Sequence, residues 1–168
     1  MSVRVGMTAP EFELRTQRYR LLRLLDLRGS FVVIYFYPGN AEPESVTESC
    51  LFRKHHDEFQ DMDTVVVGVS DDSQGSHIEF SEKWNIPFPL LADIGGRLRK
   101  EWGVPNVLSR QRGPRSSFAR SRYSANRPGR VTYVLDKEGV VRHIIQSATQ
   151  PKKHVLDSLN AIRRLRRS

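Results

Sequence analysis

The chain has 168 residues, 38% of them hydrophobic, and a formal net charge of +8 at pH 7. This length and apolar content suit a single domain, residues 1–168, with a core large enough to fold without disulfides or structural metals. The longest apolar run, Phe31–Tyr37, is far shorter than the roughly 20 residues of a membrane-spanning helix, and the N-terminus lacks the apolar core of a signal peptide. We therefore expect a soluble, cytoplasmic protein with no membrane partner.

Cysteine usage limits the chemistry further. Cys50 is the single cysteine of the chain, so neither an internal disulfide nor a cysteine cluster around a metal can form. Neither a cofactor nor a metal is expected. Any redox cycle therefore requires a partner protein, a small thiol or a second copy of the chain.

The positive charge is concentrated in two segments. Residues 109–130 contain seven arginines and no acid, and residues 151–168 contain six lysines or arginines against one acid, Asp157. The remainder is mildly acidic. This distribution is typical of an ordinary enzyme fold with basic additions, and less so of a uniformly basic nucleic-acid-binding domain.

Hydrophobic patterning predicts alternating strands and helices. Runs rich in β-branched and aromatic residues predict buried strands at 31–37, 64–69, 131–135 and 140–145. Helices are expected from residue 45 to about 61, around 77–84, around 94–102 and at the C-terminus. This order predicts an α/β protein in which a central mixed sheet carries helices on both faces.

Several short segments resemble the peroxiredoxin family in their order and spacing. They are Gly6–Leu14, Leu27–Pro38, Gly68–Asp72, Phe88–Asp93, Glu101–Val104 and Arg130–Asp136. The likeness covers nearly the whole chain and is to the type called PrxQ or bacterioferritin comigratory protein. It implies a thioredoxin-like fold, a thiol peroxidase activity that depends on thioredoxin or a small thiol, and an active-site arginine at Arg130.

The resemblance also implies that the site consists of Pro38 and the loop after it, together with Arg130. In the family this loop holds a threonine, then Pro-Gly, then the peroxidatic cysteine, with a resolving cysteine five residues later. Aligned without a gap, Glu42 replaces the threonine, Glu44 the glycine and Ser45 the peroxidatic cysteine, while Cys50 takes the resolving position. A serine hydroxyl is a poor nucleophile without a base, so ordinary peroxidase turnover is not expected.

Ser45 also has a simpler interpretation. The segment Ser45–Glu48 matches a capping box, in which the serine caps a helix and the glutamate reaches back, and we favour this role over that of a nucleophile. Arg130 could likewise pair with an ordinary carboxylate. The specific hypothesis is that Glu42 or Glu44 occupies the anion site of the family, held by Arg130 and the helix N-terminus.

Two further features leave alternatives open. Cys50 is expected to be buried as a small apolar residue, although local unwinding could expose it for a mixed disulfide or a sulfenic acid. The arginine-rich stretch 109–129 is interpreted as an inserted surface loop. A merely solvated loop is favoured, and binding to nucleic acid or to an acidic protein is the alternative.

Three classes of function follow from these observations. The leading one is a degenerate PrxQ-type peroxiredoxin, inactive or weak as a peroxidase, that acts as a binding or regulatory module. The alternative is a thioredoxin-dependent thiol peroxidase that uses Cys50. The last is a repurposed enzyme in which Ser45, Glu42, Glu44 and Arg130 perform acid–base or hydrolytic chemistry.

Overall fold

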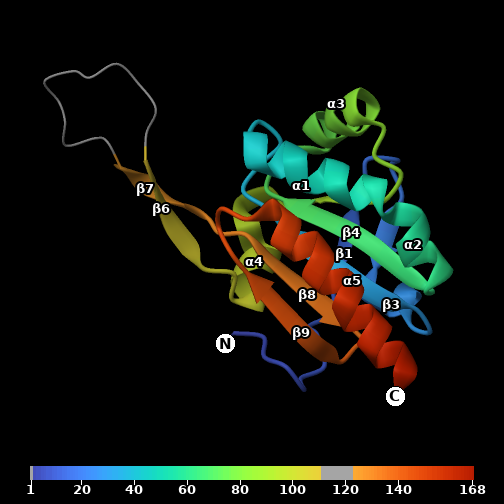
Figure 1. The fold of residues 1–168 in the computed structure, drawn as a ribbon. Coiled ribbons are helices and arrows are strands. Elements are labelled where there is room, and N and C mark those ends of the chain that lie inside the picture. The colour runs from blue at the N-terminus through green and yellow to red at the C-terminus, as the bar shows by residue number, and fades with distance from the viewer. Residues whose placement is uncertain (1, 111–122) are drawn as a thin grey trace, which may run out of the picture.

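The fold is organised around a central five-stranded sheet. The computed structural model describes residues 2–110 and 123–168, and its largest sheet has the strand order β5-β4-β3-β8-β9 (Figure 1). The strands are β3 (Phe31–Phe36), β4 (Thr64–Ser70), β5 (Leu90–Ala92), β8 (Val131–Leu135) and β9 (Val141–Gln146). β3, β4 and β5 are parallel, whereas β8 pairs antiparallel with both β3 and β9. The predicted mixed sheet is confirmed.

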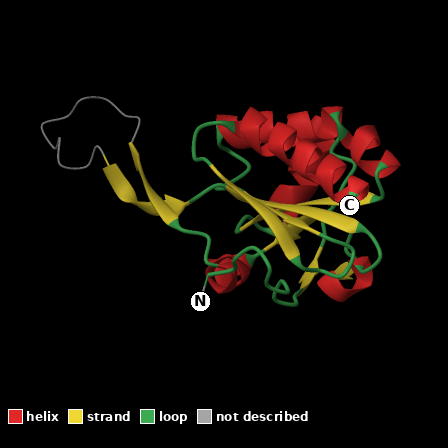
Figure 2. Cartoon of the chain, turned by 60° about the horizontal axis from the view of Figure 1, so that its bottom comes forward, coloured by secondary structure: helices red, strands yellow, loops and turns green. Residues whose placement is uncertain are grey.

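Helices cover both faces of this sheet, as expected (Figure 2). One hydrophobic cluster includes residues of α1 (Pro43–Lys54), α2 (His56–Asp61), α3 (Gln74–Trp84) and α5 (Pro151–Arg167). The other cluster includes residues of α4 (Arg97–Trp102), of the short 3-10 helix Leu24–Leu27 and of the N-terminal segment. All six residues of β3 are buried, because β3 lies between two strands and between two covered faces.

The helix boundaries differ from the prediction at one place that affects the site. The single helix expected from residue 45 to about 61 is two helices that meet at His55, and the first begins at Pro43. Proline suits a first helical position because its missing N–H group would have no partner inside the helix there. Ser45 therefore lies inside the first turn of α1 and does not cap it.

The C-terminal helix follows its predicted pattern. The apolar side chains of Val155, Leu159 and Ile162 are buried against the sheet, while the basic residues of the last turns, including Arg163 and Arg167, are exposed. Cations at this end of a helix interact favourably with its dipole. Within the part of the chain that the structure describes, no helix is both long and apolar enough to cross a membrane.

Four short strands complete the fold. β1 (Glu13–Arg15) and β2 (Leu21–Arg23) form one antiparallel pair, and β6 (Asn106–Arg110) and β7 (Tyr123–Pro128) form another that projects from the body (Figure 1). The stretch 109–129, predicted as a surface loop, therefore includes the end of β6 and all of β7. Residues 111–122, which hold most of its arginines, lie outside the described residues.

Candidate functional site

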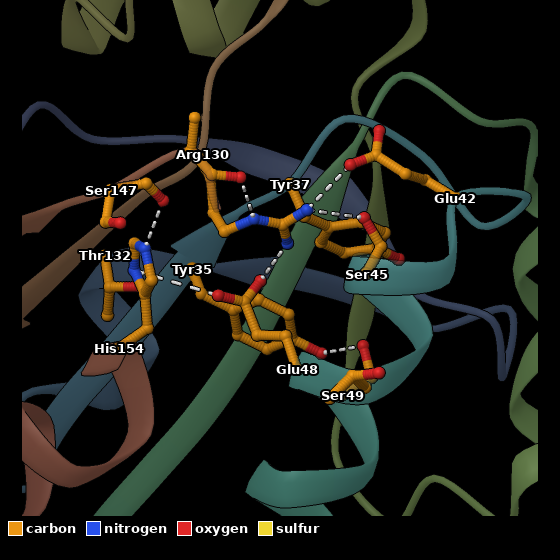
Figure 3. A network of polar contacts seen from close by, with 12 residues as sticks. Tyr35, Tyr37, Glu42, Ser45, Glu48, Ser49, Arg130, Thr132, Ser147 and His154 are labelled. Carbon is orange, nitrogen blue, oxygen red and sulfur yellow. Dashed lines mark hydrogen bonds and ion pairs between the residues drawn. The ribbon is translucent and has the colours of Figure 1, made fainter. Parts of the chain in front are cut away.

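Arg130 is the centre of a buried polar network. It directly precedes β8, and its side chain is fully buried. Its Nη1 donates to Glu48 Oε1 at 2.8 Å, and its Nη2 donates to Glu42 Oε1 at 2.9 Å and to Ser45 Oγ at 3.3 Å (Figure 3). The guanidinium is thus shared between two carboxylates, which supply the charge that a buried cation requires.

The start of α1 brings these three partners together. Glu42 is the N-cap residue, and its backbone carbonyl accepts from the amides of Ser45 and Val46 at 3.0 and 3.1 Å. Ser45 and Glu48 follow three residues apart, a spacing that places them on the same side of a helix. Both are fully buried and face Arg130. The capping box predicted for Ser45–Glu48 is therefore wrong, because the side chains of Ser45 and Glu48 both accept hydrogen bonds from Arg130.

The contact predicted between Arg130 and a loop glutamate is present, and Glu42 is the glutamate that makes it. The second half of that hypothesis is wrong, because the Glu42 side chain makes no capping hydrogen bond to the helix N-terminus. Its carboxylate is instead directed at the guanidinium and keeps 15% of its surface accessible. Glu42 therefore closes the Arg130 site from the solvent side, while Glu48 closes it from within.

A histidine from α5 extends the network beyond Glu48. His154 is fully buried, its Nε2 lies 2.8 Å from the carbonyl oxygen of Ser147, and its Nδ1 lies 2.8 Å from Thr132 Oγ1 (Figure 3). The same Nδ1 is 3.7 Å from Glu48 Oε2. The site therefore joins α1, the start of β8 and α5, which are far apart in sequence.

Burial sets the protonation of the two inner groups. It raises the pKa of Glu48 from 4.5 to about 7, against the opposing effect of Arg130. It lowers the pKa of His154 from 6.5 to about 4, and the positive charge of Arg130 adds to this shift. Both effects favour the neutral forms. Between about pH 4 and 7, Glu48 and His154 therefore meet as a carboxylic acid and a neutral imidazole, and not as an ion pair.

The other two residues assigned to the site lie outside these contacts. Pro38 is half-buried in the loop between β3 and α1. Cys50 is a free, half-buried thiol that lines a surface groove of about 550 Å³ together with Val46 and Leu51. The expectation of full burial is wrong for Cys50. Five residues after Ser45 on α1, it is turned by about 140° from the side that faces Arg130.

A second polar cluster holds the loop that carries Glu42. The side chain of Asn40 accepts from Tyr37 Oη at 2.7 Å and contacts Ser76 Oγ and His77 Nδ1 at 3.0 and 3.1 Å. Its backbone N–H donates to Asp72 Oδ2 at 2.9 Å. These hydrogen bonds connect the loop to α3 and to the segment that follows β4. They therefore hold the loop that carries Glu42 in position beside Arg130.

Sequence reasoning missed Glu48, His154 and Thr132 as members of the site. The local pattern around Glu48 instead fits a helix-capping role. No local signal marks His154, which lies more than 100 residues from Glu48. A clue was present in Pro43, since proline is typical of a first helical position and would have placed Glu48 one turn inside the helix.

Comparisons with known proteins agree with this architecture. Residues 5–144 match the model of the AhpC/TSA family, so the chain belongs to that family. The chloroplastic peroxiredoxin Q of Oryza sativa subsp. japonica is 39% identical over 160 residues, which cover 95% of this chain and 67% of that protein. The chloroplastic peroxiredoxin Q of Sedum lineare is 38% identical over 161 residues, covering 96% and 78%.

Solved structures give the same result. The peroxidoxin BcpB of Mycobacterium tuberculosis has a TM-score of 0.81 at 28% identity, with 97% of this chain and 98% of that chain covered. The bacterioferritin comigratory protein of Xanthomonas campestris has a TM-score of 0.80 at 25% identity, with 97% of each chain covered. Within the family, the type is therefore PrxQ or bacterioferritin comigratory protein, with its thioredoxin-like fold.

Proposed function

We propose that this chain is a PrxQ-type peroxiredoxin that has lost the peroxidatic thiol and acts as a binding or regulatory module instead of a peroxidase. The observation that carries the proposal is the ion pair between Arg130 and Glu42, with Ser45 beside it. In this interpretation Ser45 stands at the peroxidatic position. The arginine that would polarise a peroxide is occupied by the protein's own carboxylate.

The chemistry of the site supports this proposal. A peroxidatic thiolate attacks one peroxide oxygen, so that an S–O bond forms while the O–O bond breaks and the thiol becomes a sulfenic acid. A serine hydroxyl offers no equivalent oxidation state, and the Ser45 hydroxyl accepts a hydrogen bond from Arg130, which also binds the carboxyl group of Glu48. Glu42 adds a negative charge that opposes any further anion there.

A specific observation favours a second candidate, a thiol peroxidase that uses Cys50. The thiol is half-buried and lines a surface groove, so a peroxide or a reducing partner such as thioredoxin or a small thiol could reach it. Cys50 lies on a different side of α1 from the side that faces Arg130, so the arginine cannot assist a reaction at this thiol. We therefore expect any activity of this kind to be slow.

Hydrogen peroxide consumption with a thioredoxin system separates these candidates. The wild-type protein is compared with Cys50→Ser at equal concentration, with the reductant alone as background. The leading proposal expects both proteins to remain at background. Turnover in the wild type that disappears in Cys50→Ser would establish the second candidate.

Binding of nucleic acid or an acidic protein by stretch 109–129, and a cytoplasmic location, stay predictions.

A further inference from the structure

The outward side of α5 is strongly basic. The helix lies on the outside of the molecule, with its apolar side packed into the core (Figure 1). The exposed residues of α5 include six cations, which are Lys152, Lys153, Arg163, Arg164, Arg166 and Arg167. The helix contains one acid, Asp157, and this residue is half-buried. The surface of α5 therefore carries an excess of positive charge along its whole length.

Helix stability accounts for the cations at only one end of α5. The arginines of the last turn interact favourably with the helix dipole. Lys152 and Lys153 lie in the first turn, where the dipole disfavours cations and where no acidic residue offsets them. The two lysines therefore cost stability where they stand, and an anionic partner would explain their presence.

The cations at the two ends form one continuous strip. Lys152 precedes Arg163 by eleven residues, and Lys153 precedes Arg164 by the same number. Eleven residues are almost exactly three helical turns, so each lysine lies on the same side of the helix as its arginine, about 16 Å away. A single small anion cannot contact both ends of this strip, whereas an extended polyanion can.

Most of the strip is free of neighbouring carboxylates. Nη2 of Arg163 donates to Glu58 Oε2 of α2 at 3.0 Å. Within the described part of the chain, the other five cations of α5 form no ion pair. Five positive charges are therefore available to a partner.

The apolar content of α5 separates the possible polyanions. Insertion into a membrane surface requires an apolar face, and the apolar face of α5 is in the core. A stable contact with an acidic protein requires an apolar centre, for which α5 offers only Leu156, 37% exposed. Nucleic acid requires neither, because its phosphates are bound through charge and the release of counterions.

The side chains of α5 also favour one form of nucleic acid. Four of the six cations are arginines, which contact phosphate oxygens in a bidentate manner. The helix has no aromatic side chain on which unpaired bases could stack, so a duplex suits it better than a single strand. An α-helix matches the major groove of B-form DNA, about 12 Å wide, and not the narrow major groove of A-form RNA.

We propose that the basic outward side of α5 binds the phosphate backbone of double-stranded DNA without reading its sequence. His154 faces the Arg130 site from the buried side of the same helix, so the proposed surface is separate from that site. The inference therefore goes beyond the proposed function and does not depend on it.

Fluorescence anisotropy of a labelled DNA duplex tests this inference with the whole protein. Binding is measured between about 50 and 200 mM NaCl, and the wild type should bind with a dissociation constant of roughly 10⁻⁴ to 10⁻⁶ M near 150 mM. The logarithm of the association constant should fall linearly with the logarithm of the salt concentration. Anisotropy that stays at the value of the free duplex would overturn the inference.

Two variants remove the cations of the strip. The triple variant Arg164→Gln/Arg166→Gln/Arg167→Gln should bind about tenfold or more weakly and lower the salt slope by about 3. The double variant Lys152→Gln/Lys153→Gln should lower the slope by about 2. Its free energy of unfolding should not fall, because the lysine charges oppose the helix dipole.

A matched control removes three exposed arginines from the other face of the molecule. Arg4→Gln/Arg15→Gln/Arg20→Gln changes the net charge by the same amount, and it should bind DNA with a salt slope close to that of the wild type. An equal loss of affinity in the control would show an effect of net charge alone and would overturn the inference.

Two further results would also overturn the inference. Wild-type affinity in both α5 variants would place DNA binding elsewhere on the chain, for example in stretch 109–129. Stronger competition by polyglutamate than by unlabelled duplex, at equal charge, would indicate an acidic protein as the partner. Far-UV circular dichroism of each variant confirms that the fold is retained.

Discussion

Replacement of Glu48 or of His154 should tilt the pH dependence of stability in opposite directions. The folded-state pKa of Glu48 is raised from 4.5 to about 7, so its contribution to stability is complete below pH 4.5 and is lost as the pH rises through 7. The folded-state pKa of His154 is lowered from 6.5 to about 4, so its contribution is complete above pH 6.5 and is lost as the pH falls through 4. At roughly 1.4 kcal/mol per pH unit, each contribution amounts to about 3 kcal/mol.

In the wild type these two contributions cancel over a wide range. Between pH 4.5 and 6.5 the folded protein holds one proton on Glu48, and the unfolded chain holds one on His154, so the pair adds no slope to the free energy of unfolding. Glu48→Gln leaves only the histidine. Its free energy of unfolding, relative to wild type, should therefore rise by about 2 to 3 kcal/mol from pH 4.5 to 6.5. His154→Gln leaves only the glutamate and should fall by the same amount.

Urea unfolding followed by tryptophan fluorescence measures both differences. Each variant is compared with the wild type at pH 4.5, 5.5 and 6.5, so that the contributions of other titrating groups cancel. Opposite slopes for the two variants support the assigned protonation states. Two profiles that both run parallel to the wild type would refute the reasoning, since neither group would then titrate abnormally in the folded protein.

Three further predictions concern separate parts of the structure. Arg130→Met leaves the carboxylates of Glu42 and Glu48 without their cation, and should lower the free energy of unfolding by about 3 to 5 kcal/mol in urea titrations. The loss should be smaller at pH 5 than at pH 8, because Glu48 is ionised only at the higher pH. Equal losses at the two pH values would contradict this reasoning. Gly129→Ala places a Cβ atom 2.5 Å from the carbonyl oxygen of Pro105, and thermal unfolding should show a lower midpoint, whereas an unchanged midpoint would show that the backbone yields easily. Iodoacetamide should label Cys50 completely in the folded protein, but about tenfold more slowly than in urea, because the thiol is half-buried. Labelling that occurs only after unfolding would exclude a peroxidase that uses Cys50.

The strands of the sheet could be predicted because their residues carry strong local signals. β3 and β8 are continuous runs of β-branched and aromatic residues, and their predicted bounds lie within one residue of the observed ends. β5, a strand of three residues, and the equally short β1 and β2 have too few residues to show a period. Their pairing comes from the tertiary structure.

The site could be predicted only in part, for a similar reason. The contact of Arg130 with Glu42 followed from the resemblance and from the charges gained in the loop. The start of α1 was misplaced because Ser45–Glu48 fits a capping box locally, although Pro43 begins the helix. The role of His154 depends on the packing of α5 beside α1, which no spacing in the sequence encodes.

Arg130 is held by Glu42 beside Ser45, whose hydroxyl cannot be oxidised as a thiol can. The most direct test is the rate of hydrogen peroxide consumption by the wild type and by the double variant Ser45→Cys/Glu42→Thr, both with a thioredoxin system. We expect background consumption by the wild type and measurable turnover by the double variant, in which a thiol and a threonine replace the Ser45 hydroxyl and the Glu42 carboxylate beside Arg130. Turnover by the wild type at a rate equal to that of the double variant would contradict this expectation.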